Sequence, residues 1–284
     1  MSLARRSRAL SSVLSVLTAS ALTVSVALTA APASADPGPA PNSMASMGDS
    51  ITRGFNACGW YVDCTSRSFS TGDDSSVNGH YPRIRAVNSA INGRNHNDAK
   101  SGAKSADMAG QASTAVSQGV DYVTILIGAN DACTSSESSM TSVATYRANI
   151  DAALSRLRTG LPNAKVYLIS IPDVHRLWFV GKDSSSARST WSLFGICQSL
   201  LANPTSTAQA DVDRRARVRQ RVVDYNTQLA QACAAYGANC KFDGNAVFNY
   251  PFALSHLSGW DYFHPNASGQ RVLADVSYPA GFGW

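Results

Sequence analysis

Short apolar runs, separated by longer segments with helical spacing, form the main pattern of this chain. The runs "DYVTILIGAND" (121–131) and "AKVYLISIPD" (164–173) are apolar and rich in β-branched residues, which is typical of strands buried on both faces of a parallel sheet. The run "NSMASM" (42–47) predicts a strand near the start of the folded chain, and "ANCKFDGNAVF" (238–248) predicts the last one. The strands of the predicted sheet are therefore spread along most of the sequence.

Segments with amphipathic spacing lie between these strands. They predict helices at 81–92, 142–160, about 211–236 and, beginning at Pro265, 265–277. The segment 95–119 reads as a short strand, a turn at Ser101–Gly102 and a helix closed by Gly119. Because a helix separates two buried strands, the chain contains a βαβ unit with a right-handed crossover. These elements predict an α/β fold, a three-layer α/β/α sandwich with a mainly parallel sheet.

Two long segments interrupt this pattern. Residues 58–80 are polar and read as a loop with one short cysteine-closed turn. Residues 174–208 read as a long, irregular, serine-rich insertion that carries five large apolar side chains: Trp178, Phe179, Trp191, Leu193 and Phe194. These side chains either line an apolar groove for a ligand or belong to the core, and their composition fits both.

The first 35 residues have the pattern of a secretory signal peptide. Arginines at the start precede a weakly apolar run and the small residues Ala33-Ser34-Ala35, where a signal peptidase cuts. A membrane anchor fits less well, because the run is rich in Ser and Thr and ends at the cleavage pattern. We therefore expect a signal peptide at 1–35, a flexible proline-rich lead-in at 36–42 and a single domain at 43–284, secreted and without a stable membrane anchor.

The charge of the chain gives no reason to expect a nucleic-acid partner. The formal net charge is +5, but three of the 24 basic residues and none of the 19 acidic residues lie in the leader, which leaves +2 for the mature protein. The basic run Arg214–Arg221 has helical apolar spacing and reads as the solvated face of a helix. We expect a monomer that binds no nucleic acid.

All six cysteines follow the expected cleavage site, so disulfides are the expected state. Six cysteines allow fifteen pairings. Cys58–Cys64 and Cys233–Cys240 are close in sequence and bounded by turn residues, which leaves Cys133–Cys197 as the long-range pair. No Cys-x-x-Cys pair occurs, so zinc ligation is the weaker alternative and we expect no metal.

Residues that can carry chemistry follow the ends of the predicted strands. Ser50 comes after the first strand and Gly48-Asp49, Gly102 follows the short second strand, and Asn130 follows the strand at 121–131. The carboxyl ends of parallel strands share one edge of the sheet, where ligands bind. A glycine exposes its backbone N–H there and an asparagine presents an amide donor, as a developing oxyanion requires. We expect Asp49 to brace the turn.

The loop "DYFHP" (261–265) supplies the groups that a serine nucleophile needs. His264 suits the role of base because histidines titrate near neutrality. Asp261, three residues earlier, can turn back and accept from the other ring nitrogen, which sets the tautomer. Taken alone, Ser50 and Asn130 also fit caps, and Gly102 and Asp261 also fit turn formers. The set together with His264 indicates a catalytic site. We expect surface or structural roles for the other histidines, His80, His96, His175 and His256.

The blocks "GDSI", "SGA", "GAND" and "DYFHP" occur in the order of the SGNH, or GDSL, hydrolases, and the chain resembles that family over nearly the whole mature sequence. Ile51 stands where the family name has leucine. The resemblance implies a flavodoxin-like α/β/α fold and hydrolysis of carboxylic esters, and we expect no cofactor. It implies Ser50 as nucleophile, His264 as base and Asp261 as orienting acid. It also implies an oxyanion hole from the N–H groups of Ser50 and Gly102 and the amide of Asn130.

The substrate class is less closely defined. The stretches "SFSTGDDSSVNGHYPRI" (68–84) and "IPDVHRLW" (171–178) are similar to secreted actinobacterial lipases and to a phospholipase-B-like branch of the family. They favour a secreted esterase or lipase that acts on lipid or acyl esters. The alternatives are a phospholipase or lysophospholipase, a carbohydrate acetyl esterase and, outside enzymes, a secreted binding protein on the same fold. A binding protein would not need Ser50, Asn130 and His264 together.

Overall fold

Five strands form the central sheet, and their order decides where the loops that follow them lie. The computed structural model describes residues 38–284, so the expected signal peptide lies outside the described residues. All neighbouring strands pair in parallel. Along the sheet they run β2 (Asn95–Asn97), β1 (Met44–Gly48), β3 (Tyr122–Leu126), β4 (Lys165–Leu168) and β5 (Cys240–Phe242). This is the flavodoxin-like order, in which the chain changes direction across the sheet between β1 and β3.

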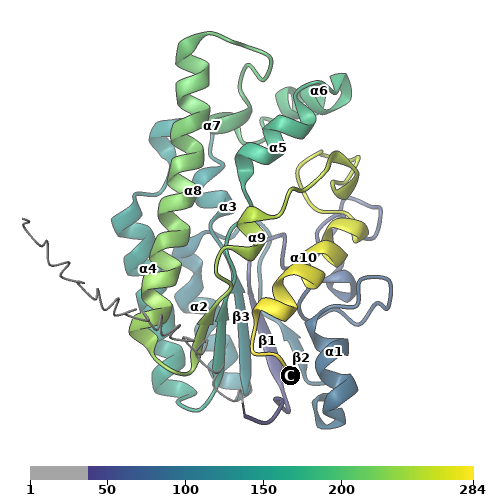
Figure 1. Ribbon diagram of the computed structural model, residues 1–284, viewed down its shortest axis with the longest axis vertical. Helices are drawn as coiled ribbons and strands as arrows, with labels where there is room; N and C mark the ends of the chain where they lie inside the picture. The colour runs from purple at the N-terminus through teal and green to yellow at the C-terminus, as the bar shows by residue number, and fades with distance from the viewer. Residues whose placement is uncertain (1–37) are drawn as a thin grey trace, which may run out of the picture. The chain divides into compact units, whose positions relative to one another are not determined.

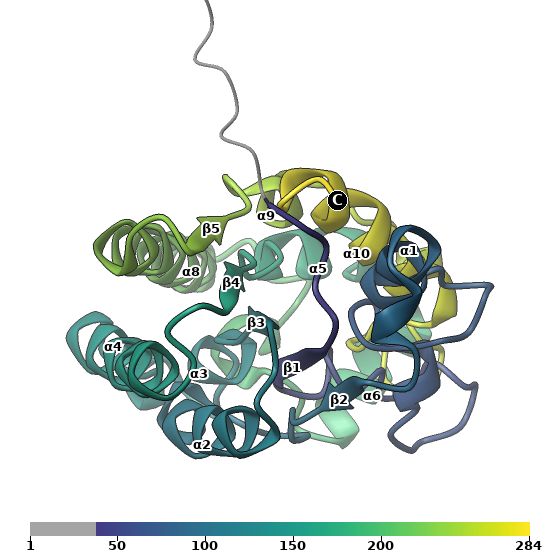
Figure 2. The same cartoon turned by 90° about the horizontal axis from the view of Figure 1, so that it is seen from below.

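Helices cover both faces of the sheet (Figures 1 and 2). Figure 2 shows α2 (Met108–Gln118), α4 (Val143–Gly160) and α8 (Gln209–Tyr236) along one face, and α1 (His80–Val87) and α10 (Ala267–Ala280) along the other. The short helices are α3 (Ala129–Ala132), α5 (Val174–Gly181), α6 (Ser185–Leu193), α7 (Gln198–Leu201) and α9 (Ala246–Asn249). The predicted α/β/α sandwich with a parallel sheet is confirmed.

The strand-forming sequences are buried on both faces, as their composition predicts. Every residue of β1 and of β3 is buried. The register pairs Gly48 with Leu126, so these two strands end level with each other. On the covering layer, the ring of Tyr146 from α4 stacks on that of Tyr225 from α8 at a centroid distance of 4.1 Å. This contact joins the two helices over the sheet.

The predicted helix ends hold within a few residues, with two corrections. The helix predicted at 81–92 ends at Val87, and a separate 3₁₀ turn, Ser89–Ile91, follows it. Gly119 has φ +65° and closes α2, and the Ser142 hydroxyl caps α4. The last helix does not begin at Pro265, because the side chain of Asn266 accepts from Gly269 N at 3.0 Å and caps it there. The helix α10 therefore begins one residue after this cap.

The prediction of an irregular insertion at 174–208 is wrong, because α5, α6 and α7 occupy most of it. Asp173 caps α5 by accepting from His175 N at 2.9 Å. Ser184 caps α6 by accepting from Ala187 N at 3.3 Å. Serine is frequent in loops, but it is also a preferred N-cap, and here it begins a helix.

The prediction that Arg214–Arg221 is a solvated helix face is wrong for its first two residues. Arg215 is buried and lies over the ring of Trp178, 4.6 Å from its centroid. Arg214 donates to Ser199 O at 2.6 Å. A guanidinium group offers five donors, so these arginines can satisfy main-chain carbonyl groups where α7 turns into α8.

Cross-links and terminal contacts complete the domain. The structure contains three disulfides in the expected pairing, Cys58–Cys64, Cys133–Cys197 and Cys233–Cys240. The end of the expected lead-in lies against the domain, since Asn88 Nδ2 donates to Ala40 O at 2.8 Å and to Pro41 O at 3.0 Å. Within residues 38–284, no helix has both the length and the apolar character needed to cross a membrane.

Candidate active site

The end of β1 places Ser50 at the edge of the sheet where the strands terminate. Gly48 has φ +151°, and a Cβ there would overlap with Leu126 O on β3 and with Thr52, so only glycine fits. The side chain of Gln111, from α2, accepts from Gly48 N at 2.7 Å and donates to Gly48 O at 2.8 Å. Hydrogen bonds to both the N–H and the carbonyl group of Gly48 therefore hold the backbone that leads into Ser50.

Ser50, His264 and Asp261 form a continuous hydrogen-bonded chain. Nε2 of His264 lies 2.7 Å from Ser50 Oγ, and Nδ1 lies 2.6 Å from Oδ2 of Asp261. The two contacts use both ring nitrogens, so the carboxylate holds Nδ1 as the donor and leaves Nε2 to accept the hydroxyl proton. The structure thus brings the three predicted residues together. Such a chain can move a proton from the hydroxyl to the ring as the oxygen attacks an electrophile.

The loop that carries Asp261 and His264 turns tightly on itself. Oδ1 of Asp261 accepts from Phe263 N at 2.9 Å and from His264 N at 3.0 Å. Tyr262, between them, has φ +52°, in the left-handed region that non-glycine residues rarely adopt. This turn brings the carboxylate back to a ring three residues later. It also places strain on the backbone that other contacts must offset.

Asn56 belongs to the site although the sequence analysis did not single it out. Its amide nitrogen donates to Oδ2 of Asp261 at 2.6 Å, and the residue is buried with φ +67°. The neighbouring Phe55 packs its ring on that of His264, with centroids 4.9 Å apart. The partners are 205 residues apart in the chain, so no local pattern signals this bond. The only signal available was the position of Asn56 between Ser50 and the cysteine-closed loop Cys58–Cys64.

Gly102 and Asn130 flank Ser50 in the order of the strands. Gly102 follows β2 and Asn130 follows β3, and these are the two neighbours of β1. A backbone hydrogen bond of 3.2 Å ties the loop after β2 to Gly48 O, and Gly102 turns in this loop with φ +83°. Asn130 Nδ2 donates to Ala103 O at 2.9 Å, and its second hydrogen is left for another acceptor. The topology thus brings both predicted donors to the edge where Ser50 lies.

Two buried carboxyl groups lie close to this edge. Oδ1 of Asp49 accepts from Ile51 N at 2.9 Å and braces the turn as predicted, while Oδ2 has no partner among the described residues. Burial raises the pKa of Asp49 to about 7; the Ile51 N–H and His264 oppose the increase, and the carboxyl of Asp131 adds to it. Asp131 accepts from Ser105 N and Oγ at 2.8 and 2.7 Å.

Across residues 38–284, no three His, Cys, Asp or Glu side chains are arranged to hold a metal.

An apolar cavity of about 70 Å³ adjoins the site. Its lining includes a sequence neighbour of each of three site residues: Ile51 after Ser50, Ala129 before Asn130 and Phe263 before His264. The helix α5 supplies one wall with Val174, Leu177 and Val180. An apolar group of a bound molecule could therefore enter this cavity while its reacting atom lies at Ser50.

The five large side chains of the 174–208 segment, for which a groove and the core were both open, do not line the cavity. Trp191 is fully buried, whereas Phe179, Leu193 and Phe194 are 52%, 78% and 65% exposed. None of these, nor Trp178, lines the cavity. On α5, the cavity face is formed by Val174, Leu177 and Val180. The ring of Trp178 instead lies beside the guanidinium of Arg215, and its Nε1 donates to Pro204 O.

Comparisons with known proteins identify the family and agree with the fold. Residues 46–272 match the family model described as the GDSL-like lipase/acylhydrolase family. An acetylxylan esterase from Geobacillus stearothermophilus, solved as a catalytic mutant, is 15% identical, with 85% of this chain and 94% of that chain covered and a TM-score of 0.54. No curated protein matches the chain significantly.

Two further solved structures are similar to this chain. An alpha/beta hydrolase from the metagenome of Lake Arreo, Spain, is 17% identical, with 85% and 94% of the two chains covered and a TM-score of 0.51. An extracellular lipase from Streptomyces rimosus is 22% identical, with 84% and 97% covered and a TM-score of 0.46. At these identities, likeness to solved structures concerns the fold alone.

Proposed function

Because the chain belongs to the GDSL-like lipase/acylhydrolase family, we propose that it cleaves carboxylic esters through an acyl-enzyme on Ser50. The observation that carries this proposal is the chain of two hydrogen bonds, 2.7 and 2.6 Å long, from Ser50 through His264 to Asp261. Oγ attacks the ester carbonyl carbon while its proton passes to Nε2. The bond to the alcohol then breaks, and His264 returns the proton to the alcohol oxygen. A water molecule repeats the sequence and releases the acid.

The negative oxygen of the tetrahedral intermediate needs hydrogen-bond donors. The N–H groups of Ser50 and Gly102 and the amide of Asn130 are proposed for this role. Their support is the strand order, which sets Gly102 and Asn130 on either side of Ser50. Loss of one such donor typically lowers kcat by about 10²- to 10³-fold.

The preferred substrate is an ester of a medium or long fatty acid. The apolar cavity, which is lined by Ile51 after Ser50 and by Phe263 before His264, supports an acyl chain as its occupant. A rim formed by Trp60, Tyr61, Val62 and Trp260 is between 49% and 67% exposed. The ring of Phe55 links this rim to His264, because it packs on the rings of both Tyr61 and His264. Trp260 Nε1 donates to Gly59 O at 2.8 Å, which links the two loops that carry this rim. Indole and phenol rings suit a lipid–water boundary, where one edge is apolar and the other is wet.

The rim also favours a second candidate, an acetyl esterase that acts on carbohydrate. The exposed rings of Trp60 and Trp260 offer flat surfaces on which a sugar could lie. The cavity argues against this candidate, because an acetyl group needs no apolar pocket beyond the oxyanion donors. A phospholipase differs from a lipase only in the alcohol part of the ester, and the exposed rim would accept either lipid.

Secretion is proposed together with this activity. The leader at 1–35 and the three disulfides support an oxidising compartment outside the cytosol. We propose a single catalytic domain at 43–284 that acts as a monomer.

A panel of p-nitrophenyl esters from acetate to palmitate tests the substrate class, with phosphatidylcholine and acetylated xylo-oligosaccharides beside it. We expect kcat/KM to rise from acetate toward medium chains by about tenfold or more, since each buried methylene adds about 0.8 kcal/mol. Activity on acetyl esters alone would favour the carbohydrate esterase, and release of fatty acid from phosphatidylcholine alone would favour the phospholipase. No hydrolysis of any ester would contradict the proposal.

A further inference from the structure

We infer that Trp191 is a positioning residue for the proposed active site, because its indole N–H holds the backbone turn that carries Asp261 and His264. Nε1 of Trp191 donates to Tyr262 O at 3.0 Å, and the indole is fully buried. Tyr262 directly follows Asp261 and lies two residues before His264, and it has φ +52°. The inference rests on the proposed function, since it concerns residues proposed to perform the hydrolysis.

The turn needs a contact from outside itself. A non-glycine residue is less stable in the left-handed region than in ordinary backbone conformations. Inside the loop, Ser258 O accepts from Tyr262 N and Ser258 N donates to His264 O, each at 2.8 Å. Phe263 N and His264 N donate to Asp261, which is itself the group to be positioned. Trp191 comes from α6, a separate element, and holds the carbonyl group at the centre of the turn.

The direction of Asp261 depends on this turn. If Tyr262 relaxes to an ordinary φ, the peptide groups on either side rotate. The N–H groups of Phe263 and His264 then no longer both point at Oδ1. The carboxylate would lose two donors and the geometry of its 2.6 Å contact to His264 Nδ1. A misplacement of this size near a reacting group is enough to change a rate by about 10²-fold.

Trp191 is itself held in place. Its carbonyl group accepts from Ile196 N at 2.9 Å and from Gln198 Nε2 at 3.0 Å. Its ring packs against Gly181 on α5, where any Cβ would overlap the indole. The Cys133–Cys197 disulfide ties the same segment to the end of α3, the helix that contains Asn130. The segment from α5 to α7 therefore bridges the two sides of the site, with Trp191 as its contact on the histidine side.

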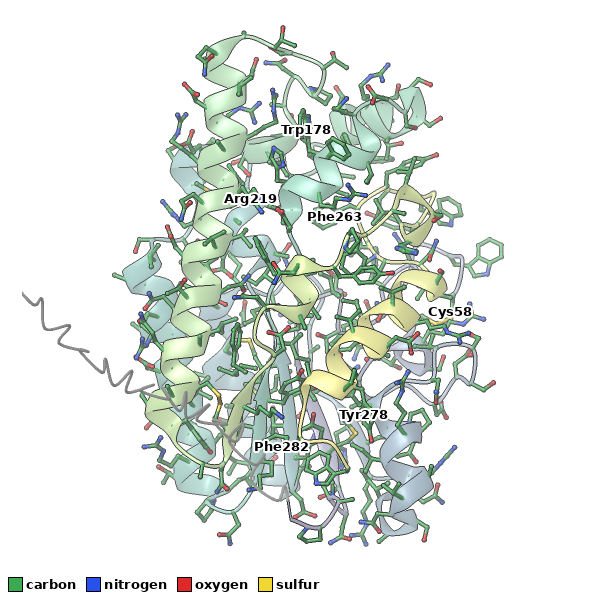
Figure 3. The ribbon with its side chains drawn as sticks, viewed as in Figure 1. Cys58, Trp178, Arg219, Phe263, Tyr278 and Phe282 are labelled. Atoms are coloured by element: carbon green, nitrogen blue, oxygen red, sulfur yellow. A yellow bond between two sulfur atoms is a disulfide. The ribbon has the colours of Figure 1, made fainter. Side chains whose placement is uncertain are left out.

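Trp178 provides a matched control on the same segment. Its Nε1 also donates to a main-chain oxygen, that of Pro204, at 2.7 Å. Figure 3 labels Trp178 on α5 and Phe263 nearer the strand ends. The Trp178 bond thus has the same chemistry as the Trp191 bond but does not contact the 261–264 turn. Replacing either tryptophan by phenylalanine removes one indole N–H and a similar volume.

The experiment compares Trp191→Phe and Trp178→Phe in the mature protein with its disulfides intact. A third variant carries 3-benzothienylalanine at position 191, which keeps the bicyclic shape and lacks the N–H. For each, we measure kcat and KM on p-nitrophenyl butyrate, the rate of fluorophosphonate labelling, the Tm, and the low-field proton NMR signal of the His264–Asp261 hydrogen bond. We expect both 191 variants to lose about 10- to 100-fold in kcat with little change in KM, and to lose or broaden the low-field signal. Trp178→Phe should keep kcat and the signal.

Other results overturn the inference. Wild-type kcat in the benzothienylalanine variant would show that the N–H has no role. Equal losses in Trp178→Phe, or losses that follow Tm in all three variants, would reduce Trp191 to a core residue. The same holds if neither 191 variant folds. Failure of the proposed function is distinct, because the wild-type protein would then neither hydrolyse the ester nor take the label.

Discussion

The amide nitrogen of Asn56 lies 2.6 Å from Oδ2 of Asp261. The loop that follows Ser50 therefore hydrogen-bonds to a carboxylate 205 residues later in the chain. His264 Nδ1 approaches the same oxygen at 2.6 Å. Each oxygen of Asp261 thus has two hydrogen-bond partners: the N–H groups of Phe263 and His264 for Oδ1, and Asn56 Nδ2 and His264 Nδ1 for Oδ2. The arrangement makes the position of the carboxylate depend on two separate loops.

Replacing Asn56 by aspartate should therefore disrupt the site in a pH-dependent way. Two carboxylates at this separation cannot both ionise without strong repulsion. We expect Asn56→Asp to lower kcat/KM and Tm more at pH 8 than at pH 5, where one carboxyl group retains a proton and can donate. The control is Asn78→Asp, an exposed asparagine that also has positive φ, +52°. Equal changes in the two variants, or no dependence on pH, would contradict the proposed contact.

Removal of the proposed nucleophile is the most direct test of the proposed chemistry. Ser50→Ala should keep the fold and lower kcat by about 10³-fold or more. A fluorophosphonate should form one adduct, located on Ser50 by peptide mass mapping. The exposed Ser135 serves as the control, since Ser135→Ala should change neither the rate nor the adduct. An adduct on another serine would refute the assignment.

The base and the orienting acid should differ in their effect. His264→Ala removes the group that carries the proton, and we expect a loss of about 10⁴-fold in kcat/KM. Asp261→Asn keeps the shape of the loop but turns one acceptor into a donor, so we expect a smaller loss of about 10²-fold. Steady-state kinetics of the two variants decide the order. Equal or reversed losses would mean that the roles are wrongly assigned.

The cavity should determine which acyl chains are used. Leu177 lines it from α5, so Leu177→Trp should fill it and raise KM about tenfold for decanoate esters, with little change for acetate. Phe179→Trp is the control, because Phe179 lies on the same helix but is 52% exposed. If decanoate and acetate are affected alike, the cavity does not hold the acyl chain.

The buried side chains of Asp49 and His80 should each make the free energy of unfolding depend on pH, in opposite directions. Burial raises the pKa of Asp49 to about 7, so the folded state keeps this proton where the unfolded chain releases it, and stability falls as pH rises from about 4 to 7. Burial lowers the pKa of His80 to about 3, so the unfolded chain binds the proton first, and stability rises from about pH 3 to 6.5. The two slopes nearly cancel between pH 4 and 6.5.

The variant Asp49→Asn separates these contributions. It keeps an acceptor for Ile51 N but has no proton to lose. Relative to wild type, its free energy of unfolding should increase by about 2–3 kcal/mol between pH 5 and pH 8. Urea unfolding at the two pH values measures the difference. A difference that does not vary with pH would mean that Asp49 does not titrate in this range.

The strands and the residues at their ends could be predicted from the sequence. A strand buried on both faces must be apolar along its length, and the runs at 121–131 and 164–173 met this condition. In a parallel sheet the carboxyl ends share one edge, so Ser50, Gly102 and Asn130 were expected together, and the strand order sets them side by side. The short helices α5 to α7 were missed, because brief helices full of serine and aromatic residues carry too little periodicity to be distinguished from a loop.

The sequence by itself determined the α/β class and the disulfide-rich character, and it indicated the proposed triad of Ser50, Asp261 and His264, since each depends on local composition or on motif order. Only the tertiary structure decided which residues support that triad. The bonds of Asn56 to Asp261 and of Trp191 to Tyr262 join positions 205 and 71 residues apart. The cavity depends likewise on which face of α5 turns inward. These features follow from packing directions between distant segments, and no local pattern of hydrophobic and polar residues encodes them.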